Sequence, residues 1–227
     1  EALIIECGVS LKEAKVALDF NIKKVVGALV THEHGDHAGH AKEYIDARIN
    51  VWMSQGTDKA LNGKIKSPYY PLLLKQGYKQ KMGGFTVLAF DVKHDCIEPM
   101  GFLIQHEEIG VLLFATDTYY LPYKFEGLTN IMIECNYRTD LLARNIKAGK
   151  IPAALRDRTL ESHMSFDTCL EALQANDLSK VNNIILLHLS DGNSHAEEFK
   201  RDVHKATCKA VWIADKGLKI KLNKTPF

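Results

Sequence analysis

The chain has 227 residues, of which 46% are apolar and 25% charged, a balance typical of a globular protein with a sizeable core. Its apolar runs fall short of the ~20 residues that a membrane-spanning helix needs. The formal net charge of +1 leaves any binding of polyanions to local basic patches. The five cysteines are far apart, with no Cys-x-x-Cys pair, which argues against a disulfide framework and predicts a reducing, cytoplasmic setting.

Strand and helix patterns alternate along the chain. Ser10 and Glu13 have the spacing of a capping box and predict a helix over 11–20. Further helical patterns lie at 38–48, 139–148, 166–176 and 194–206. Strands are predicted at 2–5, 25–31, 50–53, 85–94, 100–106, 110–116, 130–134, 183–188, 209–214 and 218–222. This alternation predicts one mixed α/β domain over 1–227, and we expect an N-terminal strand to be missing from the numbering.

The stretch from Asn62 to Gly84 is the most irregular part of the sequence, and it is expected to form a surface excursion or flap. From Lys59 to Phe90 there are six lysines and no acid. Lysines bind backbone phosphates and tyrosines stack on bases, so four side chains are candidates for substrate binding: Lys64, Lys66, Tyr69 and Tyr70. A second basic run, 138–158, has six basic residues and two acids. Ordinary solvated faces are the alternative for both runs, and a flap packed on a second copy would give a homodimer.

The segment LVTHEHGDHAGH at 29–40 places four histidines after an apolar run. Two histidines at i and i+2 can converge on one metal ion, as His32 and His34 would. Asp36 and His37 offer a second pair. A histidine-rich surface loop is the alternative interpretation.

Three later side chains, each at the end of a predicted strand, support the metal interpretation. They are His94, Asp117 and His188. The carboxyl ends of strands in α/β sheets are where binding sites gather. Burying isolated charges there would cost several kcal/mol, on the usual order of magnitude, and shared metal ions would offset that cost.

In order along the chain, these seven side chains resemble the ligand set of the metallo-β-lactamase superfamily. The resemblance implies two divalent metal ions, Zn²⁺ or Mn²⁺, because such N/O ligand sets accept both. It implies His32, His34 and His94 around one ion, Asp36, His37 and His188 around the other, and Asp117 as the bridge. The implied fold is a four-layer αβ/βα sandwich of two mixed sheets. One departure is that Glu6, in LIIECG, stands where the superfamily usually has an aspartate that supports the histidine motif.

Later motifs are similar to those of the phosphodiesterase and nuclease branches. HLSDGNS at 188–194 resembles a His-x-Ser segment near the last ligand, which makes Ser190 a candidate for substrate binding. ESHMSFDT at 161–168 resembles a ribonuclease Z motif whose histidine, here His163, meets the scissile phosphate. IECNY at 133–137 resembles the segment whose glutamate, here Glu134, supports that histidine. Over most of its length the chain is similar to the YycJ-like group (VicX or WalJ), regarded as DNA-directed nucleases.

The implied function is hydrolysis of phosphodiester bonds in DNA or RNA by a metal-activated water. Asp36 would orient the water or take its proton, and His163 would bind a phosphate oxygen or protonate the leaving alkoxide. Glu134 would hold the tautomer of His163. A plain loop histidine and a strand-end salt bridge are the alternatives for these last two residues. A phosphodiesterase of cyclic or small nucleotides, and a thioester or lactam hydrolase, remain as alternative functions.

Overall fold

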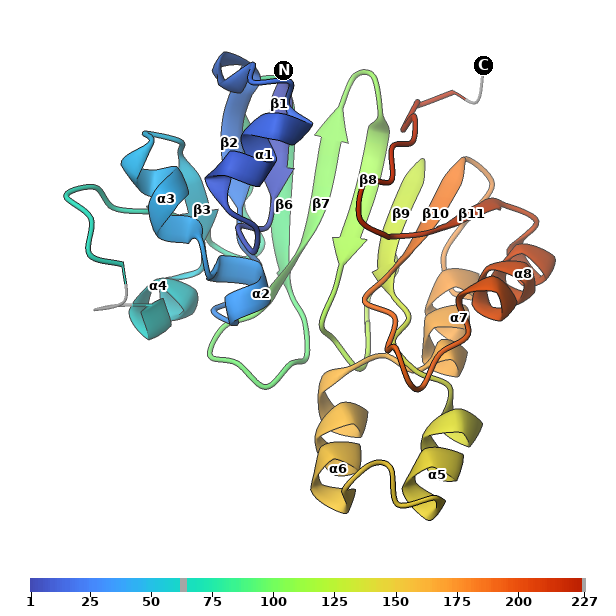
Figure 1. Cartoon of the computed structure of the whole chain (residues 1–227). Coiled ribbons are helices and arrows are strands. Elements are labelled where there is room, and N and C mark those ends of the chain that lie inside the picture. The colour runs from blue at the N-terminus through green and yellow to red at the C-terminus, as the bar shows by residue number, and fades with distance from the viewer. Residues whose placement is uncertain (62–64, 226–227) are drawn as a thin grey trace. The chain divides into compact units, whose positions relative to one another are not determined.

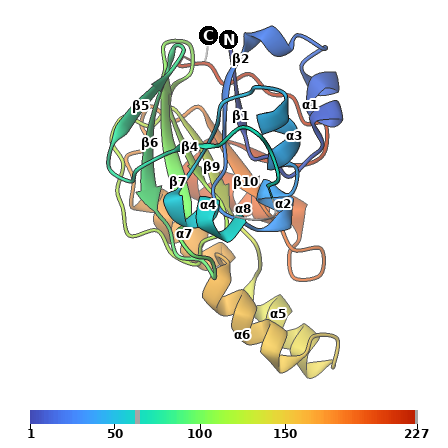
Figure 2. The ribbon, with the colours of Figure 1, turned by 90° about the vertical axis from the view of Figure 1, so that its left-hand side faces the viewer.

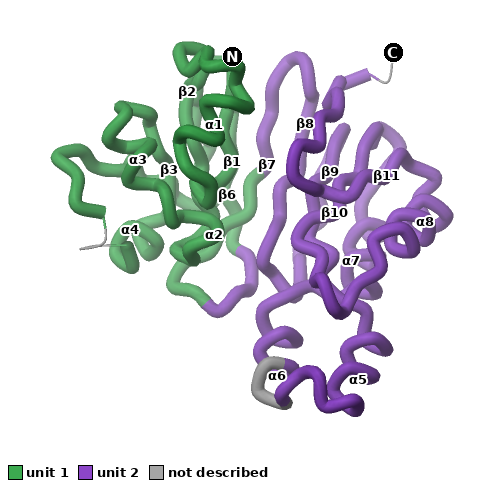
Figure 3. Tube along the Cα trace, in the orientation of Figure 1, with its two compact units in different colours: residues 1–91, 96–102 green, residues 92–95, 103–227 purple. Residues whose placement is uncertain are grey.

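The computed structural model describes residues 1–61 and 65–225. The chain divides into two compact units, with 1–91 and 96–102 in unit 1, and 92–95 and 103–227 in unit 2 (Figure 3). Its strands form two sheets, and each unit combines strands with helices (Figure 1). The predicted α/β class is therefore confirmed, while the assignment of 1–227 to a single domain stays a prediction. Across the described residues, each helix is too short or too polar to cross a bilayer.

Unit 1 contains a four-stranded sheet in the order β1-β2-β3-β4, whose strand pairings are all parallel. The expected mixed pairing is thus found in the other sheet, which joins antiparallel and parallel strands. The strands of unit 1 are β1 Ala2–Ile5, β2 Val25–Leu29, β3 Val51–Met53, β4 Leu72–Leu73, β5 Lys79–Met82 and β6 Phe85–Asp91. Its helices are α1 Leu11–Ala17, α2 Gly35–Ala38, α3 Ala41–Asp46 and α4 Gln55–Leu61, with a 3₁₀ turn at Ile22–Lys24.

The start of α1 shows how local sequence fixes an element. The Ser10 side chain accepts the Glu13 N–H, and the Glu13 carboxylate accepts the Ser10 N–H, so the predicted capping box is confirmed. The helix ends at Ala17, three residues before the predicted end. Asp19 and Phe20 adopt positive φ angles there, which a helix cannot continue through.

Unit 2 holds the strands that carry the later candidate residues. They are β7 Met100–His106, whose first three residues belong to unit 1, β8 Gly110–Ala115, β9 Asn130–Glu134, β10 Asn183–Leu187 and β11 Ala210–Ile213. Within unit 2 these strands lie in the order β11-β10-β9-β8-β7, with β8 to β11 parallel to one another. The helices are α5 Thr139–Lys147, α6 Ala153–Ser162, α7 Phe166–Gln174 and α8 Ala196–Thr207. Within unit 2, α5 and α6 form a helical pair that extends beyond the end of the sheet (Figure 2).

The structure departs from the predicted elements in four further places. The stretch 62–84 is not wholly irregular, because it contains β4, paired with β3, and β5, paired with β6. The predicted strand at 218–222 is wrong: the Lys221 carbonyl accepts the Asn183 side-chain amide instead of joining a ladder. Helices α4 and α6 were not predicted. Among the side chains of α6 that the structure describes, apolar residues do not recur at helical spacing. The sequence pattern therefore did not predict this helix. Homodimerisation through 62–84 stays a prediction.

Candidate metal centre

In unit 1, parallel strand pairing places Glu6 beside the histidine motif. Ile5 lies opposite Leu29 in the β1–β2 ladder, so the residues that follow both strands emerge at the same edge. The Thr31 hydroxyl donates to Glu6 Oε1 at 2.6 Å, and the Thr31 N–H donates to Glu6 Oε2 at 3.3 Å. Glu6 Oε1 also lies 3.2 Å from His37 Nδ1. Glu6 therefore contacts the motif that it was predicted to support.

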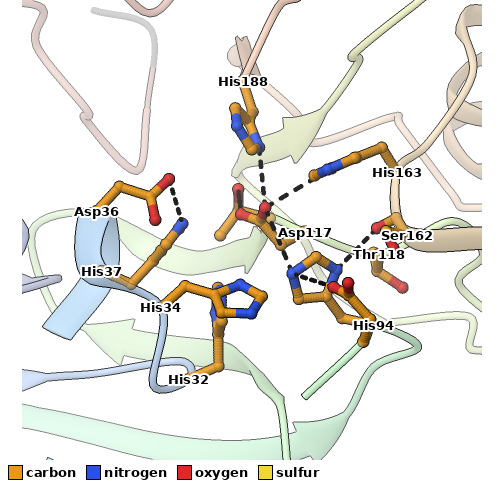
Figure 4. Close-up of polar contacts among 12 residues, drawn as sticks. His32, His34, Asp36, His37, His94, Asp117, Thr118, Ser162, His163 and His188 are labelled. Carbon is orange, nitrogen blue, oxygen red and sulfur yellow. Dashed lines mark hydrogen bonds and ion pairs between the residues drawn. The ribbon is translucent and has the colours of Figure 1, made fainter. Parts of the chain in front are cut away.

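The histidines of the motif form a tight group within unit 1. His32 Nε2 lies 3.0 Å from His34 Nδ1, and the rings of His32 and His37 are 4.1 Å apart (Figure 4). His32 is almost completely buried, and its Nδ1 lies 2.9 Å from the Thr31 hydroxyl. The Asp36 carboxylate is 67% exposed, with Oδ2 3.5 Å from His37 Nε2. Converging imidazole nitrogens and a neighbouring exposed carboxylate are a donor set suited to a divalent cation.

A close backbone approach holds this motif in place. A Cβ added to Gly8 would lie 1.6 Å from the Asp36 carbonyl oxygen, so only glycine fits there. The Cys7 N–H donates to the His37 carbonyl at 2.7 Å, and the His40 N–H donates to the Cys7 carbonyl at 2.9 Å. Sequence reasoning missed Gly8, although a glycine just after the first strand was the available signal.

In unit 2, parallel strand pairing again brings together residues at the ends of three neighbouring strands. Ala115 of β8 lies opposite Ile133 of β9, and Glu134 lies opposite Leu187 of β10. Asp117, Glu134 and His188 therefore meet at the carboxyl edge of these strands. Asp117 and His188 adopt positive φ angles of 49° and 55°. Such angles are uncommon outside glycine and cluster at functional sites, where the surrounding structure holds them.

Asp117 is the centre of this group. Its Oδ1 lies 3.0 Å from His188 Nδ1, 3.6 Å from His163 Nδ1 and 3.8 Å from His94 Nε2 (Figure 4). The Thr116 hydroxyl donates to its other oxygen at 2.8 Å. One atom from each of Asp117, Glu134, His163 and His188 fits within 4.8 Å of the others. Because two of these four are buried carboxylates, the group fits a divalent cation by charge as well as by donor type.

Glu134 is completely buried and orients His163. Its Oε1 lies 2.7 Å from His163 Nδ1, and its Oε2 accepts the Thr118 N–H at 2.7 Å. This arrangement favours a proton on Nδ1 of His163 and leaves Nε2 for another partner. The sequence did not predict the role of Thr118, because its donor is a backbone N–H, which nearly every residue type has.

Burial and hydrogen-bonding partners shift the pKa values of two of the histidines in opposite directions. Burial lowers the pKa of His94, and the Ser162 carbonyl, which accepts the His94 Nδ1–H at 2.9 Å, offsets only part of that effect. Burial also disfavours the charged form of His188, but hydrogen bonds to Asp117 and then Glu134 raise the pKa of His188 to about 10. The carboxylates thus stabilise positive charge at His188, as they would stabilise a bound cation.

Comparison with known proteins identifies the family of this chain. Residues 1–117 match the model of the metallo-beta-lactamase superfamily, just over half of the chain. The chain belongs to the metallo-β-lactamase superfamily. It is 27% identical to exodeoxyribonuclease YycJ of Bacillus anthracis over 211 residues, covering 86% of this chain and 76% of the relative.

Two solved structures share the fold of this chain. YhfI from Bacillus subtilis, described as a metallo-beta-lactamase fold protein, superposes with a TM-score of 0.69 at 14% identity, covering 95% of this chain and 85% of the other. The short form of human tRNase Z gives a TM-score of 0.61 at 12% identity, covering 98% and 88%. At these identities the likeness concerns the fold alone.

The candidate substrate-binding residues of this superfamily member lie in different settings. Ser190 lines a pocket of about 420 Å³ in unit 2 with Asn136, His163 and His188, here called the histidine pocket. Lys64 lies outside the described residues, and Lys66 is exposed. Tyr70 is 86% exposed, which leaves its ring accessible.

Tyr69 does not have the open ring expected of a base-stacking residue. It packs against the buried cluster of unit 1, and the Arg48 guanidinium lies 3.5 Å from its ring centroid.

The basic run 138–158 carries less unpaired positive charge in the structure than a count of its basic and acidic residues suggests. Arg138 pairs with Glu198, and Arg158 pairs with Asp95, because the fold brings acids from outside the run.

Proposed function

We propose that this chain is a metal-dependent nuclease that hydrolyses phosphodiester bonds in DNA or RNA. The observation that carries the proposal is the buried Glu134 bound to His163, next to Asp117. A thiolate leaves from a thioester without a proton donor, whereas a phosphodiester has a non-bridging oxygen and a leaving alkoxide for this histidine to contact. The similarity to a protein named an exodeoxyribonuclease supports the same class of substrate.

By the superfamily pattern, the chain would bind two divalent cations. The proposed ligands are His32, His34 and His94 for one ion, Asp36, His37 and His188 for the other, and Asp117 for both. Zn²⁺ or Mn²⁺ bound there would act as a Lewis acid and lower the pKa of water to about 7. The observed donors, imidazole nitrogens and carboxylate oxygens, fit either ion.

Two side chains of the protein would then carry out separate proton transfers, one accepting a proton and the other donating one. The Asp36 carboxylate, which is well exposed, would accept a proton from the attacking water. His163, with Nδ1 held by Glu134, keeps Nε2 to bind a phosphate oxygen or to protonate the leaving alkoxide. Asn136 and Ser190 add neutral polar groups to the histidine pocket, where a phosphate would be bound.

Hydrolysis of labelled single- and double-stranded DNA and RNA, with added Mn²⁺ or Zn²⁺, tests the proposal. Cyclic nucleotides, a thioester and a chromogenic lactam serve as competing substrates. We expect Asp36→Asn and His163→Ala to abolish phosphodiester cleavage, with the metal content of His163→Ala unchanged. The matched control is His195→Ala, an exposed histidine at the start of α8. Full nuclease activity in His163→Ala, or turnover of the lactam or thioester alone, would overturn the proposal.

A further inference from the structure

Unit 2 has a second and larger hollow, of about 910 Å³, here called the tyrosine hollow. Its wall includes His94 and Asp95 from the segment after β6, Tyr119 from the segment after β8, and Arg158, Leu160 and Glu161 from α6. None of these side chains except His94 has a role in the function proposed above.

Helix α6 separates the tyrosine hollow from the histidine pocket. Thr159 and His163, four residues apart, line the histidine pocket. Arg158 and Glu161 line the tyrosine hollow from another face of the same helix. At the end of α6 the Ser162 carbonyl accepts the His94 Nδ1–H, as Figure 4 shows. Ser162 lines the tyrosine hollow and the next residue, His163, lines the histidine pocket, so the two hollows have adjacent wall residues at the end of the helix.

The tyrosine hollow exposes aromatic and aliphatic surface. Tyr119 is 42% exposed and Leu160 is 40% exposed, although both are large apolar side chains. Exposed apolar groups gathered at a concave surface indicate a binding site more often than scattered ones do. An exposed tyrosine ring next to a phosphodiester-cleaving site is the kind of surface on which a nucleobase stacks.

The charges of the tyrosine hollow do not favour a phosphate. Arg158 is paired with Asp95 at 3.0 Å, and Arg156 is paired with Asp157. Glu161 adds a further carboxylate to the wall. Positive charge is therefore not in excess there, whereas the carboxylates can accept hydrogen bonds from the amino groups of an uncharged base.

We propose that the tyrosine hollow binds the nucleoside unit next to the scissile phosphate, with Tyr119 as the stacking platform. The inference rests on the proposed nuclease function and deepens it, because it makes the base part of what the site recognises. A phosphate then occupies the histidine pocket and its base lies on the other side of α6. Tyr119 is a binding residue in this arrangement and takes no part in proton transfer.

The test compares two phosphomonoesters, which a phosphodiesterase does not consume. Binding of deoxyadenosine 5′-monophosphate and of deoxyribose 5-phosphate to the metal-loaded full chain is measured by calorimetry. We expect the wild type to bind the nucleotide about tenfold more tightly, the lower part of the range for stacking one base on an aromatic side chain. Tyr119→Ala should lose this preference, and Tyr119→Phe should keep it.

Tyr120→Ala is the matched control, because Tyr120 is the next residue and is 51% exposed. It should bind like the wild type. Equal binding of the two ligands by the wild type, or a preference that survives in Tyr119→Ala, would overturn the inference even if the protein cleaves DNA. Absence of oligonucleotide cleavage by the wild type would instead overturn the nuclease proposal itself, so the two failures are distinguishable.

Discussion

Replacement of Gly8 by alanine tests whether the first strand holds the histidine motif in place. The new methyl carbon would lie 1.6 Å from the Asp36 carbonyl oxygen and 2.4 Å from its carbon. Both atoms belong to backbone, so no side-chain rotation relieves the clash. One of the two segments must move by about 2 Å to reach ordinary van der Waals contact at roughly 3.5–4 Å.

The cost of that movement follows from what ties the segments together. The Cys7 N–H to His37 bond and the His40 N–H to Cys7 bond join them on either side of the contact. Each such bond has a net worth of about 1 kcal/mol, and overpacking a close contact costs about 1–3 kcal/mol. We therefore expect the free energy of unfolding to fall by about 3 kcal/mol. For a chain of this length, Tm falls by roughly 2–4 °C per kcal/mol, or roughly 6–12 °C in total.

Thermal unfolding and metal analysis after dialysis measure the two consequences. Gly8→Ala should melt earlier and should retain less Zn²⁺ or Mn²⁺, because Asp36 and His37 are displaced with the backbone. Gly35→Ala is the control in the same motif, since its added Cβ meets no described atom within 4 Å. A Gly8→Ala protein that melts within 2 °C of the wild type, on the order of 1 kcal/mol or less, and binds metal equally well would refute the reasoning.

Three further predictions concern the candidate site. Glu134→Gln should lower kcat by about 10- to 100-fold with little change in KM, because a neutral amide holds His163 less firmly; an unchanged kcat in steady-state hydrolysis would exclude this role. Thr31→Val should cost about 1–2 kcal/mol of stability in denaturant unfolding, since the hydroxyl bonded to Glu6 is lost, whereas Thr31→Ser should lie closer to the wild type. Chelation of the metal should lower Tm by roughly 10 °C if the ion is present at about a thousandfold its Kd, which corresponds to ~4 kcal/mol. Added Mn²⁺ or Zn²⁺ should restore it, and a melt insensitive to chelator would argue against a metal centre.

The sequence by itself determined the elements and motifs that depend on near neighbours. The capping box at Ser10 and Glu13, the helix over 166–174 and the strand over 130–134 all follow from spacing and periodicity within a few residues. The position of chemically active residues just after strands was also visible. Because the ends of such strands gather at one edge of a sheet, that position already predicted that Asp117 and His188 would meet, whereas Glu134 was predicted only from the resemblance of its segment to a known motif.

Only the tertiary structure decided contacts that join distant parts of the chain. The 2.7 Å contact between Glu134 and His163 spans 29 residues, and the pairing of Arg158 with Asp95 spans 63. Gly8 cannot be replaced without a clash, because the backbone of Asp36 lies against it. The residue types at these two positions do not predict that close approach. Helix α6 was not predicted because its described side chains form no apolar stripe along one face of the helix. The physical reason is common to these cases: local propensity and periodicity act over one or two turns, whereas charge pairing and close backbone approach depend on which segments the fold brings together.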